Sequence, residues 1–136
     1  MNQDHVKVLV SRRMEQATDC LEDGRFLLSA KRGARTVVNR AYYAAFYAVL
    51  ALLQTTGSTP RKHKGVLALF DSEFVKPGLL SKDESRVLHQ LFNARLEDDY
   101  QRIDPVQPEE AAELITAAER FVQSVQGYLT RTGYLQ

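Results

Sequence analysis

Cysteine is almost absent from this 136-residue sequence, in which Cys20 is the only one. A single cysteine excludes an internal disulfide, so we expect the protein to work in a reducing cytoplasm. None of the three histidines (His5, His63 and His89) lies at metal-ligand spacing from another ligand, and no glycine-rich phosphate loop is found. The sequence therefore predicts neither a metal site nor a cofactor.

A large charge excess and long hydrophobic runs are also missing. The formal net charge is +1, so any attraction for nucleic acid must come from a local patch of basic residues. The longest apolar run, residues 41–53, is about two thirds of the length that a membrane span requires. The first residues include acidic groups where a secretory signal needs a positive start. We therefore expect a soluble single domain, residues 1–136, with a core over 4–130 and a short flexible tail over 131–136.

Helical periodicity dominates the sequence, and no stretch alternates apolar with polar residues as a strand would. Apolar or small residues recur every three or four positions over 10–28 and over 111–129. The segment 39–53, NRAYYAAFYAVLALL, is apolar around the whole helix, which is typical of a helix surrounded by others. These patterns predict an all-α fold, an antiparallel four-helix up-and-down bundle with one extra short helix.

Local signals mark where the helices begin. Asp4 is the expected N-cap of the first helix, and Thr59 is the expected N-cap of the short helix that follows Pro60. Ser81 and Glu84 have the spacing of a capping box at the start of the helix that should end near residue 100. Inside the first helix, residue 24 is a glycine, which either lets a neighbouring helix approach closely or weakens the helix by roughly 1 kcal/mol relative to alanine.

Several polar residues do not fit a plain core. On the second helix Asn39 and Tyr43 share one face, whereas Arg40 points about 100° away. On the fourth helix Arg95 follows Leu91 on the side that faces the bundle, where an unpaired guanidinium would cost several kcal/mol. Two interpretations stay open: hydrogen bonding at a flared end of the bundle, or a single polar cleft.

Acceptors for Arg95 are available in both interpretations. Asp98 and Asp99 stand three and four residues further along the same helix, and Asn39 or Tyr43 would reach it if the helices cross at that level. Basic residues also gather at 61–64 (RKHK) and at 31–35, where they could contact phosphates or form a solvated surface.

Three segments in this order resemble the HEPN family, the higher eukaryote and prokaryote nucleotide-binding domain, in its small stand-alone bacterial and archaeal branch. They are 39–53, KHKGVLALFDSEFVKPGLL at 62–80, and ARLEDDY at 94–100. The resemblance implies a helical bundle, commonly a homodimer, with a minimal nucleotidyltransferase protein as its partner. It also implies a relation to RNA-cleaving toxins whose partner acts as the antitoxin.

The catalytic signature of RNA-cleaving HEPN proteins is an arginine followed, after four to six residues, by histidine. Arg95 stands at the arginine position, but Asp99 and Tyr100 stand where the histidine is expected, and no arginine of this chain has a histidine at that spacing. Cleavage through the ribose 2′-hydroxyl needs a proton-transfer group near neutral pKa, and a tyrosine with an ordinary pKa of about 10 is a poor base.

Three hypotheses follow. The first is a nucleotide- or RNA-binding HEPN protein of a toxin–antitoxin-type pair, without the usual RNase histidine. The second is a metal-independent endoribonuclease with an altered Arg-x4-Tyr site, in which Arg95 and Tyr100 act with His63 or His89. The third is a cleft that only fixes the helix register.

The candidate catalytic residues are Arg95 and Tyr100, and Tyr100 is also a candidate for modification with AMP by the partner. The candidate ligand-binding residues are Asn39, Arg40, Tyr43, His63, Asp98 and Asp99.

Overall fold

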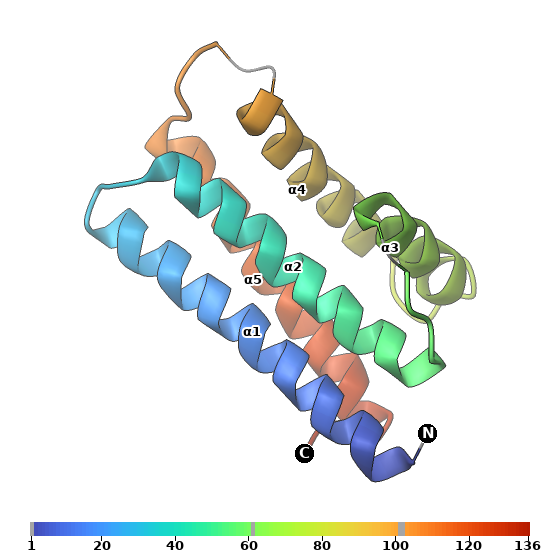
Figure 1. Ribbon diagram of the computed structural model, residues 1–136. Coiled ribbons are helices and arrows are strands. Elements are labelled where there is room, and N and C mark those ends of the chain that lie inside the picture. Colours follow the sequence, from blue (N-terminus) through green and yellow to red (C-terminus); the bar gives the residue numbers. More distant parts are fainter. Residues whose placement is uncertain (1, 61, 101–102) are drawn as a thin grey trace.

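The computed structural model describes residues 2–60, 62–100 and 103–136, while the side chains of residues 98–100 lie outside the description. The helices are α1 (Gln3–Ser29), α2 (Ala34–Thr56), α3 (His63–Phe70), α4 (Lys82–Tyr100) and α5 (Pro108–Arg131). The four long helices run alternately up and down, and the short α3 lies beside the start of α4 (Figure 1). The described residues contain no strand, so the predicted all-α bundle is confirmed.

Helix α2 is the centre of the bundle, because it packs against α1, α3, α4 and α5. Its buried side chains include Tyr42, Val49 and Leu52, each with no exposed surface. Among the described residues, α2 alone is long and apolar enough to cross a membrane, but 67% of that apolar stretch is buried inside the bundle. Burying each large apolar side chain stabilises the fold by roughly 1.5–3 kcal/mol, so the apolar surface of α2 is explained by the core that it forms.

Two predicted helix starts are wrong by a few residues. The side chain of Asn2, rather than Asp4, caps α1, since its Oδ1 accepts hydrogen bonds from the backbone N–H of Asp4 at 2.7 Å and of His5 at 3.2 Å. Helix α3 begins at His63 and not after Thr59, because the backbone is still extended at Lys62. An asparagine cap is as favourable as an aspartate cap, so sequence alone did not separate the two choices at α1.

Helix α3 continues beyond its last α-helical residue, Phe70, as a turn of π-helix. A π-helical turn, η1 (Asp71–Val75), continues α3 and carries the buried Phe74. The backbone then turns, with Leu79 and Leu80 both donating to the carbonyl of Phe74 at 2.9 Å. Gly78 has φ of 86° in this turn, a conformation that side chains with a Cβ rarely adopt.

The capping box at the start of α4 forms as predicted. The backbone N–H of Glu84 donates to Ser81 Oγ at 3.4 Å, and the backbone N–H of Ser81 donates to Glu84 Oε2 at 3.2 Å. We expect Ser81→Ala to lower the free energy of unfolding by about 1 kcal/mol, measured by urea denaturation, since one helix-end donor loses its acceptor. Ser81→Asp keeps an acceptor and should retain the stability; an equal loss in both variants would contradict the cap.

Gly24 permits a close approach between helices. A Cβ atom at this position would lie 2.7 Å from Cδ1 of Ile115 on α5 and 3.6 Å from Cβ of Arg40 on α2. Real Cβ atoms do not approach to 2.7 Å, so any larger residue would displace the buried Ile115. The glycine therefore serves helix packing in the interior of the bundle.

The C-terminal residues fold back onto the end of α5. The backbone N–H groups of Tyr134 and Leu135 donate to the carbonyl of Leu129 at 2.8 and 3.2 Å, and both side chains are partly buried against the core. Two expectations stay predictions: that residues 131–136 are flexible, and that the chain forms a single domain.

Candidate functional site

Arg95 lies on the side of α4 that faces α2, and its Nε atom is buried. The guanidinium carbon is 5.4 Å from the ring centroid of Tyr42 and 5.3 Å from that of Tyr43. Both distances fall within the range of about 6 Å over which a cation is attracted to an aromatic face. The structure thus places Arg95 against two tyrosines of α2.

Arg40 reaches the same tyrosine from its own helix. Its guanidinium carbon is 5.5 Å from the ring centroid of Tyr43. Oδ1 of Asn39 accepts hydrogen bonds from Nε of Arg40 at 3.2 Å and from Nη2 at 2.8 Å, and Nη1 donates to Sγ of Cys20 at 3.4 Å. Asn39 therefore orients Arg40 in the described contacts, and the ring of Tyr43 touches two guanidinium groups.

His63, the first residue of α3, completes this group. Its Nδ1 is 2.8 Å from the hydroxyl oxygen of Tyr42, and its ring stacks on Phe46 with centroids 4.4 Å apart and planes at 17°. Burial lowers the pKa of His63, and the positive charge of Arg95 lowers it further. The imidazole is therefore neutral at pH 7. We call Arg40, Tyr42, Tyr43, His63 and Arg95 the arginine–tyrosine cluster.

Tyr42 is the member of the cluster that sequence reasoning missed, because its position belongs to an apolar face of α2. The side chain is fully buried, and burial raises its pKa well above that of an ordinary tyrosine, although Arg95 opposes this shift. A tyrosine at a position where phenylalanine would satisfy packing was the available signal. A buried hydroxyl needs a hydrogen-bond partner, and that partner is His63.

Other predicted residues lie apart from the cluster or outside the description. The side chains of Asp98, Asp99 and Tyr100, in the last turn of α4, are outside the described residues, as is Arg61. Nε2 of His89 is 2.7 Å from Oδ2 of Asp71, whose Oδ1 accepts a hydrogen bond from Ser85 at 2.6 Å. These contacts connect α4 to η1. In the described contacts, His63 belongs to the group of side chains around Arg95, and His89 does not.

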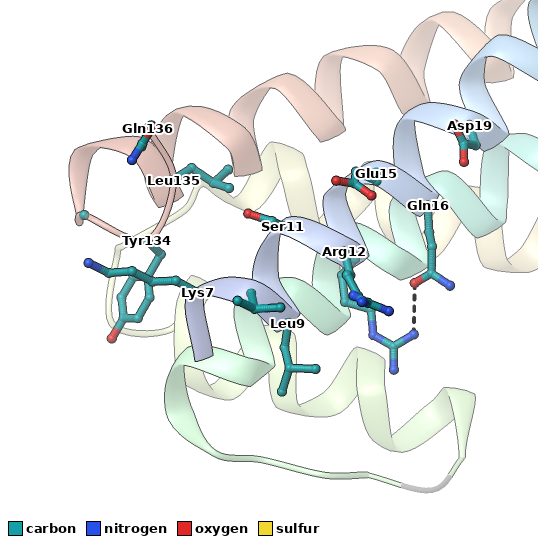
Figure 2. Close-up of a pocket in the computed structure, with 13 residues that line it drawn as sticks. Lys7, Leu9, Ser11, Arg12, Glu15, Gln16, Asp19, Tyr134, Leu135 and Gln136 are labelled. Atoms are coloured by element: carbon teal, nitrogen blue, oxygen red, sulfur yellow. Dashed lines mark hydrogen bonds between the residues drawn. The ribbon is translucent and has the colours of Figure 1, made fainter. Parts of the chain in front are cut away.

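One hollow in the surface lies apart from the cluster. It measures about 1040 Å³ and runs between the first half of α1 and the C-terminal residues, where Lys7, Arg12 and Tyr134 line it (Figure 2). No member of the arginine–tyrosine cluster lines it. Within the cluster Tyr42 is buried, and the other four side chains are partly exposed.

The lowered pKa of His63 predicts how stability depends on pH. An unfolded histidine has a pKa of about 6.5, so below this value the unfolded chain binds the proton more readily than the folded one. The stability that His63 contributes is complete above about pH 6.5 and is lost as the pH falls toward the folded pKa. The free energies of unfolding of wild type and His63→Gln, measured by urea denaturation, should therefore converge from pH 7.5 to pH 5. A constant or widening difference would contradict the prediction.

The protein is an all-α bundle in which Arg95 of α4 contacts the two tyrosines of an Asn-Arg-x-Tyr-Tyr segment of α2. The model of the HEPN domain matches residues 10–128. The chain belongs to the HEPN domain family, as the three sequence segments indicated.

The chain is similar to proteins of Thermotoga maritima and Methanocaldococcus jannaschii. A UPF0332 protein of Thermotoga maritima is 38% identical over 111 residues, which cover 82% of this chain and 83% of that protein. "Putative toxin MJ0605" of Methanocaldococcus jannaschii is 38% identical over 91 residues, 67% of each chain. "Putative toxin MJ0142" of the same organism is 34% identical over 99 residues, 73% of this chain and 67% of that protein. These similarities support a toxin-like HEPN family.

Proposed function

We propose that this HEPN protein binds RNA or a nucleotide at the arginine–tyrosine cluster, as the cytoplasmic component of a toxin–antitoxin-type pair. The observation that carries the proposal is that Arg40 and Arg95 both contact the ring of Tyr43, while a neutral His63 stands beside them. Two guanidinium groups held by aromatic rings in a chain of net charge +1 form the local basic patch that binding to phosphate requires.

The side chains around the cluster suit the two parts of a nucleotide. Arginine presents a planar fork of donors that binds two phosphate oxygens at once. Tyr43, Phe46 and Tyr47 lie next to one another on α2, with ring centroids about 6 Å apart, and all three are partly exposed. Aromatic rings of this kind stack on bases of any sequence. We also propose Asp98 and Asp99, three and four residues after Arg95 in the sequence, as ligand-binding residues.

The proposed partners follow from family membership and from the relatives named as toxins. We propose a homodimer and a minimal nucleotidyltransferase partner that acts as the antitoxin, with Tyr100 as the acceptor of AMP. Sedimentation should show a dimer at micromolar concentration. Incubation with the partner and ATP should add the mass of one AMP to the wild type and none to Tyr100→Phe. A monomer would contradict the proposed homodimer, and an unchanged mass would contradict the transfer of AMP to Tyr100.

Binding to RNA is tested with the purified full-length chain. A fluorescently labelled single-stranded RNA should bind and remain intact, and binding should weaken as salt rises, because phosphate contacts release counterions. A parallel titration with ATP separates a nucleotide ligand from RNA. Absence of binding to both ligands at high micromolar protein would defeat the proposal.

The second candidate function is a metal-independent endoribonuclease. The observation that favours it is His63, which lies against Tyr42 and Tyr43 beside Arg95 and so supplies a histidine that the Arg-x4-Tyr segment lacks. Purified protein would then cleave RNA in the presence of a chelator. His63→Gln and Arg95→Ala would each abolish cleavage, while His89→Gln, at the separate histidine of α4, would not.

A further inference from the structure

We infer that Tyr42 is a positioning residue, which holds His63 as a neutral hydrogen-bond donor with its proton on Nε2, aimed at an anionic oxygen of the ligand. The phosphate half of this inference rests on the proposed function. The contact between Tyr42 and His63 does not, because it is made in the protein without a ligand.

The direction of the hydrogen bond follows from the burial of Tyr42. Its side chain has no exposed surface, so bulk water does not reach the hydroxyl group. Its other described neighbours meet it through aromatic rings (Tyr43, Phe46 and Phe92) or through the guanidinium of Arg95, which has donors and no acceptor. Nδ1 of His63, at 2.8 Å, is the acceptor that the described residues offer. A buried hydroxyl proton left without an acceptor is costly, so Tyr42 donates.

The tautomer of His63 follows from that direction. A neutral imidazole has one nitrogen that donates and one that accepts. Since Nδ1 accepts from Tyr42, the proton must be on Nε2, at the other edge of the ring. Phe46 stacks on the imidazole and restricts the plane of the ring. Burial, and then the neighbouring charge of Arg95, disfavours a second proton. Among the described residues, only Tyr42 forms a hydrogen bond with His63, which leaves Nε2–H for a ligand.

This arrangement favours binding over cleavage. A general base must present a lone pair to the hydroxyl that it deprotonates. Nε2 of His63 presents a proton instead, so it binds an acceptor such as a phosphoryl oxygen, whose charge Arg95 and Arg40 neutralise. The same cluster thus recognises a phosphate by charge and by one directed hydrogen bond.

The test is the tautomer of His63 in the full-length protein without ligand, measured at pH 7.5 by long-range proton–nitrogen NMR with ¹⁵N-labelled histidine. We expect the Nε2–H tautomer in the wild type and in Tyr47→Phe, which changes a tyrosine of the same helix outside this hydrogen bond. Tyr42→Phe should give a mixture of tautomers. An Nδ1–H tautomer in the wild type, or a tautomer unchanged in a folded Tyr42→Phe, would overturn the inference. The wild-type measurement decides even if Tyr42→Phe fails to fold.

The ligand half has a separate readout. Titration with a short single-stranded RNA should shift the Nε2–H signal of His63, and Tyr42→Phe should bind this RNA about 3- to 10-fold more weakly, the effect of one hydrogen bond. If the tautomer is as expected but RNA binds without affecting that signal, the role of His63 in recognition is overturned. If neither this RNA nor ATP binds, the proposed function fails, while the role of Tyr42 in positioning His63 stands.

Discussion

Arg95→Ala is expected to weaken the binding of single-stranded RNA by about 1.5–3 kcal/mol, the range for hydrogen bonds to charged groups. Its effect on stability should be small, because the rings of Tyr42 and Tyr43 that it contacts remain packed against Phe46 and other side chains. Affinity is measured by fluorescence anisotropy, and stability is measured by the melting curve of the same variant.

Two further variants make this result specific. Arg95→Lys keeps the charge but loses the planar fork, so we expect an intermediate loss of affinity. Arg86→Ala is the matched control on the same helix, since Arg86 is 75% exposed and pairs with Asp83 three residues before it. It should bind RNA as the wild type does. If Arg95→Ala instead lost about 3–5 kcal/mol of stability with unchanged affinity, Arg95 would be a buried structural ion and the functional assignment would be wrong.

The second large effect is expected in the core. Phe70→Ala should lower the free energy of unfolding by about 3–5 kcal/mol, a large part of the roughly 5–15 kcal/mol that stabilises a domain. Phe70 has no exposed surface, and its ring centroid lies 6.3 Å from that of Phe74 on η1 and 5.6 Å from that of Phe121 on α5. Removing the ring leaves a cavity where α3, η1 and α5 meet. Urea denaturation at pH 7.5 measures the loss.

Phe26 offers the matched control for this prediction. It is a phenylalanine of α1 that is 71% exposed, so Phe26→Ala should change stability by no more than about 0.5 kcal/mol. Phe70→Leu retains much of the buried volume and keeps a measurable unfolding transition if the alanine variant does not fold. Equal effects of the Phe70→Ala and Phe26→Ala substitutions would show that the packing around Phe70 does not stabilise the fold.

The sequence by itself determined the helices and their burial. A periodicity of three and four residues is a property of neighbours along one helix, so it can be read without knowing what packs against it. The capping box of Ser81 and Glu84 is local for the same reason, and it formed as predicted. The all-round apolar surface of residues 39–53 correctly placed α2 at the centre of the bundle. The three HEPN-like segments indicated the family to which the chain belongs, since the HEPN domain model matches residues 10–128.

Only the tertiary structure decided which polar residues meet. His63 lies 21 residues after Tyr42 and 32 before Arg95 in the chain, and spacing along the sequence says nothing about the level at which separate helices cross. The long side chain of Arg40 also turns back toward Tyr43, which the direction of its Cα–Cβ bond did not indicate. The level at which α2 crosses α3 and α4 depends on the simultaneous packing of many side chains from all three helices. In the structure this packing places His63 beside Tyr42, whereas His89 pairs with Asp71.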